Sequence, residues 1–301
     1  MSVEKRLFRA YGQGCGRGLL IYALVAVVMV SGFCCVSVLV MAVPGENRAI
    51  AWAVGIALFV MLAVGVTVAW AVWAIRRRAS TLDDVFLPLG LEGKAYLQNG
   101  RQYHGAYHGY PVHVYFSRGP TLTIYLDAPL GVRMGVGRSG ALSGAAAKIT
   151  SKDALEVDDP EFGHLVVYPS HREWASEFLE NPQAREGILR LTNEETATEV
   201  RVFSIAPGAV MWQVRYLPMR LITTENVRSW LDDLYQLTRL AQSVTPPEHP
   251  IQESGLEHTV RSERSKLTMP IVGVTCGVIA LMSLCILGVA GALIYLTESG
   301  L

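Results

Sequence analysis

Three long apolar stretches limit what this chain can fold into more than any other feature of its sequence. They cover residues 19–43, 50–75 and 269–296, and none of them contains a charged side chain. A helix needs about 20 apolar residues to cross the hydrocarbon core of a bilayer. The sequence therefore predicts three transmembrane helices, and the short connection at residues 44–48 makes the first two a helical hairpin.

The distribution of Lys and Arg predicts how these helices are oriented. Positive side chains near the ends of membrane helices favour the cytoplasmic side. Ten of them flank the predicted helices on one side, including Arg76, Arg77 and Arg78, whereas Arg48 alone lies on the other side. We therefore expect a protein of the plasma or inner membrane. Its basic tail (residues 1–18) and main domain would be cytoplasmic, and residues 297–301 would lie outside.

The predicted spans carry few polar side chains, and none is a carboxylate, a His or a basic residue. Ion and proton pathways use such groups, so the sequence argues against a transporter that works alone. Gly273 and Gly277 form a small-xxx-small pattern that predicts close helix packing within this chain, although Gly is also common in membrane helices generally. Trp70 and Trp73 lie near the end of their predicted helix, as interfacial aromatic residues do.

The composition between the second and third stretches is that of a globular domain. Residues 80–260 contain 22 acidic and 15 basic residues, a net charge of −7, and no Cys. Because a single domain usually has about 100–150 residues, we predict one cytosolic domain at residues 79–244. An acidic domain argues against nucleic acid as a partner. The lack of Cys excludes a disulfide framework or a thiolate metal site there.

Local patterns predict an α+β domain with an antiparallel sheet packed by helices. Alternating strands are expected at 95–98, 101–107, 112–117, 122–127, 155–157, 164–168, 199–205 and 210–217, and helices at 171–180, 182–191 and 225–244. His108-Gly109 predicts a two-residue hairpin turn. Ser170 and Glu173 have the spacing of a capping box, and Asn181-Pro182 predicts a second helix start. Asp232 and Asp233 are expected on the solvated side of the last helix. Residues 245–268 form a polar linker, of which 249–268 are expected to be a flexible tether.

Two histidines are the candidate metal ligands. If His108-Gly109 is a turn, His104 stands opposite His113 on one face of the hairpin, close enough for both imidazoles to share a metal ion. Such a site needs further ligands, and no Cys or regularly spaced carboxylate supplies them. A solvent-facing pair of histidines is therefore the alternative interpretation.

The sequence contains no motif that predicts catalysis. Gly135, Gly137 and Gly140 match the pattern G-x-G-x-x-G, but a dinucleotide-binding site needs a buried parallel strand before it and a long helix after it. We therefore interpret residues 135–140 as a loop. The nucleophile elbow, the paired-His zinc helix and the phosphate-binding loop are all missing from the sequence. The sequence therefore predicts no catalytic residue and no cofactor.

Part of the domain resembles a family of uncharacterised bacterial membrane proteins. The resemblance begins with Leu155-Glu156-Val157-Asp158-Asp159-Pro160-Glu161-Phe162, which includes an acidic turn. It continues through the strand at 164–168, the helices at 174–191, the strands at 199–217 and the closing helix. In that family two transmembrane helices precede a cytosolic α+β domain of unknown function. The third apolar stretch departs from this arrangement. The resemblance implies a bacterial source and an interaction domain, and it implies no site residue.

The sequence leaves three hypotheses for function. The first is a non-enzymatic protein, anchored in the lipid bilayer, whose cytosolic domain binds another protein or the membrane surface. The second is a metal- or small-molecule-binding sensor or enzyme that uses His104 and His113. The third is an accessory subunit of a transporter.

Overall fold

The chain divides into two compact units. The computed structural model describes residues 48–96, 100–117, 120–138, 154–157, 159–193 and 199–262. Of these, residues 48–82 and Glu199 belong to the first unit, and the others belong to the second.

α2 is a single helix of 39 residues, Arg48–Phe86, and includes the second predicted membrane span at 50–75 without interruption. In the part of the chain whose structure is described, no helix combines the length and the apolarity that crossing a membrane requires. The predicted spans at 19–43 and 269–296, with Gly273 and Gly277, lie outside the described residues. The membrane spans therefore stay predictions.

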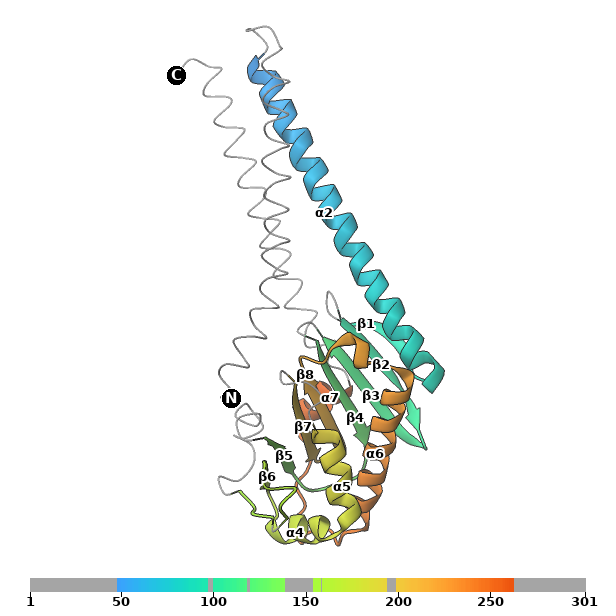
Figure 1. Ribbon diagram of the computed structural model, residues 1–301, viewed down its shortest axis with the longest axis vertical. Helices are drawn as coiled ribbons and strands as arrows, with labels where there is room; N and C mark the ends of the chain where they lie inside the picture. The colour runs from blue at the N-terminus through green and yellow to red at the C-terminus, as the bar shows by residue number, and fades with distance from the viewer. Residues whose placement is uncertain are drawn as a thin grey trace. The chain divides into compact units, whose positions relative to one another are not determined.

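The second unit is built on an antiparallel sheet of eight strands, in the order β1-β2-β3-β4-β8-β7-β5-β6 (Figure 1). The α+β class with an antiparallel sheet packed by helices is thereby confirmed. The strands are β1 (Glu92–Tyr96), β2 (Gly100–Tyr107), β3 (Tyr110–Ser117), β4 (Thr121–Asp127), β5 (Met134–Arg138), β6 (Leu165–Pro169), β7 (Val200–Ala206) and β8 (Ala209–Arg215). Two short 3₁₀ helices, η2 (Leu87–Leu89) and η3 (Met219–Leu221), connect elements of the unit.

The first four strands form the predicted meander. β2 and β3 are joined by His108 and Gly109, whose φ angles are 47° and 86°. Two successive positive φ angles define the hairpin turn whose twist matches that of the strands. β7 and β8 meet at a second tight turn, where Gly208 has a φ of 83°.

Two helices, α5 (Pro182–Thr192) and α6 (Thr224–Ser243), cover one face of the sheet, and α4 (Arg172–Glu180) packs against α5 (Figure 1). Trp230 of α6 packs on Trp212 of β8, with ring centroids 4.7 Å apart. The indole N–H of Trp212 donates a hydrogen bond of 2.7 Å to the carbonyl of Leu191 in α5. The core of the unit therefore lies between this face of the sheet and the helices.

The opposite face carries the C-terminal segment. Tyr115 pairs with Thr123, and Trp212 pairs with the next residue, Ile124, so Tyr115 and Trp212 point to opposite faces. The hydroxyl of Tyr115 donates a hydrogen bond of 2.5 Å to the carbonyl of Arg261 in α7 (Gly255–Ser262). The sequence predicted a flexible tether at 249–268. As far as Ser262, this segment instead lies on the sheet (Figure 1).

Several predictions of local structure are corrected. Gly135 and Gly137, expected in a loop, lie in β5, because the backbone groups that glycine shares with every residue pair with β7 on one side and β6 on the other. The strand expected at 155–157 reduces to one bridge between Leu155 and Val167. The capping box of Ser170 is also wrong, since its hydroxyl donates to the carbonyl of Arg133 instead.

Candidate functional site

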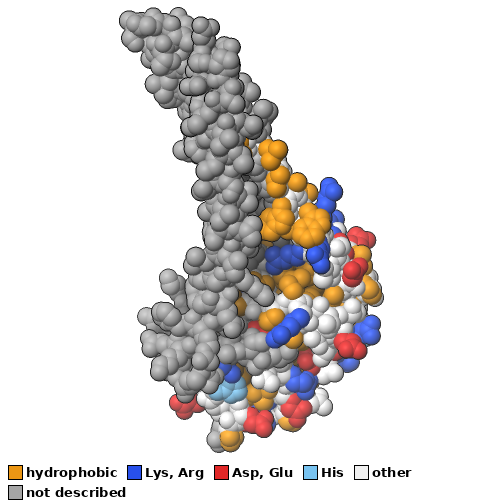
Figure 2. Space-filling view, turned by 45° about the horizontal axis from the view of Figure 1, so that its top comes forward, with side chains coloured by type: hydrophobic (Ala, Val, Ile, Leu, Met, Phe, Trp, Pro, Cys, Tyr) orange, Lys and Arg blue, Asp and Glu red, His pale blue; other side chains and the backbone are white. Residues whose placement is uncertain are grey.

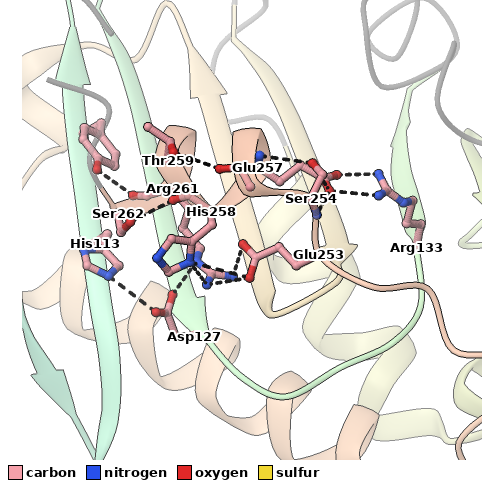
Figure 3. Close-up of polar contacts among 12 residues, drawn as sticks. His113, Asp127, Arg133, Glu253, Ser254, Glu257, His258, Thr259, Arg261 and Ser262 are labelled. Atoms are coloured by element: carbon pink, nitrogen blue, oxygen red, sulfur yellow. Dashed lines mark hydrogen bonds and ion pairs between the residues drawn. The ribbon is translucent and has the colours of Figure 1, made fainter. Parts of the chain in front are cut away.

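A buried group of ion pairs in the second unit is centred on Arg261. Its guanidinium lies between Asp127, at the end of β4, and Glu253, in the segment before α7 (Figure 3). Arg261 Nε is 3.1 Å from Asp127 Oδ1, and Nη1 is 3.1 Å from Glu253 Oε1. Nη2 donates a further hydrogen bond of 3.1 Å to Glu253 Oε2. We call Arg261, Asp127 and Glu253 the Arg261 clasp.

Burial makes the Arg261 clasp energetically important. The Arg261 side chain is 9% exposed, and those of Asp127 and Glu253 are 22% and 21% exposed. The contact between Arg261 Nε and Asp127 Oδ1 has the distance of an ion pair but not the angle of a hydrogen bond. A buried charge that loses its partner is strongly destabilising, so the three side chains depend on one another.

Two histidines lie at the edges of the clasp (Figure 3). His113 Nε2 is 3.5 Å from Asp127 Oδ2, and His258 Nδ1 is 3.7 Å from Glu253 Oε2. Each imidazole thus faces a carboxylate that also pairs with Arg261. The cation occupies the centre of the cluster.

A second contact holds the start of α7 on the sheet. Arg133 donates two hydrogen bonds to the carboxylate of Glu257, at 2.5 and 3.0 Å (Figure 3). Ser254 and Glu257 also form a reciprocal capping box, because each side chain accepts a hydrogen bond from the other's backbone N–H. Ser254 and Glu257 have the S-x-x-E spacing of a capping box in the sequence, although a capping box was predicted only at Ser170.

The surroundings of Glu257 shift its pKa. Burial opposes the charged carboxylate, but the hydrogen bonds from Arg133 and Ser254 outweigh it, so the pKa of Glu257 lies below its ordinary value of 4.5. The carboxylate is therefore charged at neutral pH, as the contact with Arg133 requires.

Two glycines make room for the C-terminal segment. A Cβ atom at Gly208 would lie 2.5 Å from Arg261 Nη1 and 2.7 Å from Glu253 Oε2. A Cβ atom at Gly131 would lie 2.6 Å from Cβ of Pro250, and the carbonyl of Gly131 accepts a hydrogen bond of 2.7 Å from Ile251 N–H. The sheet surface is thus shaped to hold this segment.

The predicted pairing of His104 with His113 is confirmed, since the two residues are register partners on β2 and β3. His104 Nε2 is 3.4 Å from Glu92 Oε2 of β1, and His113 turns to Asp127. Within the described ranges, no group of three or more His, Cys, Asp or Glu side chains is arranged to hold a metal ion. Metal binding by the pair stays a prediction.

The two aspartates of α6 are not simply solvated, as the sequence analysis expected. Asp233 is 8% exposed and accepts hydrogen bonds of 2.9 and 2.8 Å from Arg190 of α5. Asp232 accepts a hydrogen bond of 2.7 Å from Tyr107. Burial and this hydrogen bond raise the pKa of Tyr107 to about 12. Their positions on one helix could not show that partners from α5 and β2 would reach them.

Arg76, Arg77 and Arg78, the predicted topology determinants, lie in α2. Arg76 and Arg77 are exposed and Arg78 is half-buried. The guanidinium of Arg77 lies over the ring of Trp73, 5.3 Å from its centroid.

No protein-family model matches this chain, and a comparison with curated proteins finds no match. Among solved structures, the chain is similar to the crystal structure of the mycobacterial trehalose monomycolate transport factor A, TtfA. The TM-score is 0.39 at 11% sequence identity, over 58% of this chain and 98% of that chain. A similarity at this level carries no argument about function. The resemblance to a bacterial membrane-protein family stays a prediction.

Proposed function

We propose that the protein is a membrane-anchored accessory protein without catalytic activity, whose α+β domain binds another protein at the cytoplasmic surface of the membrane. The observation that carries this proposal is the Arg261 clasp, which holds the C-terminal segment on the sheet. α2 continues from the predicted span at 50–75 to Phe86 without a break, and the clasp shortens the connection to the third predicted span.

The clasp shortens the connection to the third predicted span. A free linker over 245–268 would have 24 residues and could extend to roughly 80 Å. With Arg261 held on the sheet, the seven residues 262–268 separate the clasp from the span, a reach of roughly 25 Å. A partner of the domain must therefore present its binding surface close to the bilayer, as another membrane protein does.

A binding role is also supported by how the domain uses its polar groups. Arg261, Asp127 and Glu253 hold the C-terminal segment, and Arg133 with Glu257 holds the start of α7. These charges face one another in pairs rather than converging on an open cavity. Their arrangement suits a rigid platform.

A groove between α5 and α6 is the surface that we would test first for the partner. It has a volume of about 650 Å³. Its walls carry Gln183, Glu186 and Arg190 of α5, and Tyr235, Gln236 and Arg239 of α6. Arg and Tyr are enriched in protein interfaces, and the groove lies on the helical side of the sheet, away from the clasp.

The test is affinity purification of the full chain from detergent-solubilised membranes after mild cross-linking. We expect one membrane protein to be recovered repeatedly in a constant ratio. Arg239→Glu should reduce this recovery, whereas Arg215→Glu, at an exposed position on β8, should not. Repeated recovery of the protein alone would contradict the proposal. An unchanged yield with Arg239→Glu would exclude the groove only.

A second candidate is an accessory subunit of a transporter, in which the membrane partner is the transporter itself. The similar crystal structure is that of a transport factor, but that role belongs to that protein and is not evidence for this chain. The identity of the co-purified protein decides between a transporter and another partner.

The sensor hypothesis centred on His104 and His113 has a separate test. Metal content is measured on the purified full chain and on its His113→Ala variant. Bound metal that is lost in the variant would favour a sensor. Equal content in both proteins would leave the pair as a structural feature of the hairpin.

A further inference from the structure

An exposed apolar stripe runs along α2. Leu62, Val66, Trp70 and Trp73 are 67%, 62%, 57% and 54% exposed. Their spacings of four, four and three residues place them on one side of the helix. Figure 2 shows hydrophobic side chains gathered along the described part of α2. Large exposed apolar patches mark sites where a protein contacts another protein or a membrane. We therefore expect the stripe to be covered by one of these.

The stripe ends in positive charge. Arg77 follows Trp73 by four residues, so it continues the same side of the helix, and its guanidinium lies 5.3 Å from the centroid of the Trp73 ring. Arg76, beside it, is also exposed. The sequence has no acidic residue between Arg48 and Asp83. Asp83 itself is bound to Arg101 and to the hydroxyl of Tyr103.

We propose that Trp70, Trp73, Arg76 and Arg77 form a binding site for the phosphate group of an anionic phospholipid. This inference rests on the proposed insertion of α2 in the membrane. Arg presents a planar fork of N–H donors that matches phosphate oxygens, and Trp rings favour the level of the headgroups. The apolar stripe faces the acyl chains, while Trp73 holds the Arg77 guanidinium beside the headgroup.

The positive charge of Arg76 and Arg77 favours a lipid ligand over a protein ligand. The cytoplasmic leaflet is negatively charged and attracts basic residues next to a membrane helix. The aromatic rings and the arginines follow the apolar stripe in the order in which a helix leaving a bilayer meets acyl chains, headgroups and water.

The test measures which lipid stays with the protein. The full chain is reconstituted in nanodiscs of phosphatidylcholine mixed with phosphatidylglycerol, and retained lipids are identified by native mass spectrometry. We expect phosphatidylglycerol to be enriched over phosphatidylcholine. Replacing both Arg76 and Arg77 by Gln should reduce this enrichment by roughly tenfold or more. The matched control, Arg215→Gln with Arg220→Gln, changes two exposed arginines of the other unit and should leave it intact.

Two further measurements test the role of Trp73 and the identity of the bound anion. Trp73→Leu keeps the stripe apolar but removes the ring, so it should weaken the enrichment several-fold. Added inorganic phosphate should not displace the lipid, and displacement would show a site for free anions instead. Equal retention of both lipids by a chain that is firmly inserted would overturn this inference alone. Failure of the chain to insert would overturn the proposed function as well.

Discussion

At the scale of single residues, Arg261 is the side chain on which the C-terminal segment depends most. Arg261→Met keeps much of the volume but leaves Asp127 and Glu253 as half-buried charges without their cation. Removing one partner of a buried pair costs about 3–5 kcal/mol. Hydrogen exchange of the amides at 249–262 should therefore accelerate by roughly 100-fold. Arg220→Met, at an exposed position, is the control, and equal protection in both variants would contradict this role.

The contact between Arg133 and Glu257 predicts a dependence on acid pH. Because the pKa of folded Glu257 lies below 4.5, its contribution to stability is complete above pH 4.5 and is lost as the pH falls through the folded value. The melting temperature of the full chain in detergent should fall more steeply below pH 4.5 than that of Glu257→Gln. Parallel curves for the two proteins would rule out this contribution.

Some residue pairs could be predicted from the sequence and others could not. His104 and His113 were paired correctly because the turn at His108-Gly109 sets the register of the hairpin. The clasp was missed because Asp127 and Arg261 are far apart in the sequence, and no local pattern links a strand end to a segment beyond the last core helix. Only the capping pair of Ser254 and Glu257 left a local signal.

At the scale of elements, the tight turn between β7 and β8 has two roles. Gly208 has a positive φ, and the space where its Cβ would lie is occupied by Arg261 and Glu253. Gly208→Ala should therefore be more destabilising than Gly109→Ala. Gly109 has a similar φ of 86°, but nothing lies within 4 Å of its Cβ position. In both variants, placing an alanine at a positive φ costs about 1–2 kcal/mol of backbone strain. Thermal unfolding and hydrogen exchange of residues 249–262 measure the difference between the two variants. Equal effects would contradict a role of Gly208 in making room for the Arg261 clasp.

The start of α5 offers a second test at this scale. The side chain of Asn181 accepts a hydrogen bond of 2.9 Å from Gln183 N–H, as predicted. Asn181→Ala should reduce stability by about 1 kcal/mol. Glu173→Gln on α4 should have almost no effect, since no capping box forms there. Urea unfolding measures both variants. A larger loss of stability with Glu173→Gln than with Asn181→Ala would contradict the assignment of Asn181 as the helix cap.

Elements with a strong periodic pattern were predicted well, and those without one were not. The four meander strands and α6 show clear periods of two and 3.6 residues, and they occur close to the predicted positions. β5 was missed because its sequence, Met134–Arg138, contains two glycines and therefore lacks the alternating side chains of a strand. Its place between β7 and β6 is set by pairing with distant strands.

At the scale of the whole molecule, the order of strands could not be predicted. The sequence showed segregated strands and helices, which is enough for the α+β class. It did not show that β4 pairs with β8, or that all eight strands join in one sheet. This pairing brings the end of β4 beside the turn before β8. Asp127 and Gly208 thereby form the surface on which the C-terminal segment lies.

The central claim is that the domain is anchored in the membrane at both ends and lies on its cytoplasmic side. The most direct measurement is protease digestion of the full chain in membrane vesicles of known orientation, after an alkaline wash. We expect the chain to stay in the membrane fraction. The domain at 79–244 should be protected in right-side-out vesicles and degraded in inverted ones. Release by the alkaline wash, or degradation of the domain from the outer side, would contradict the account.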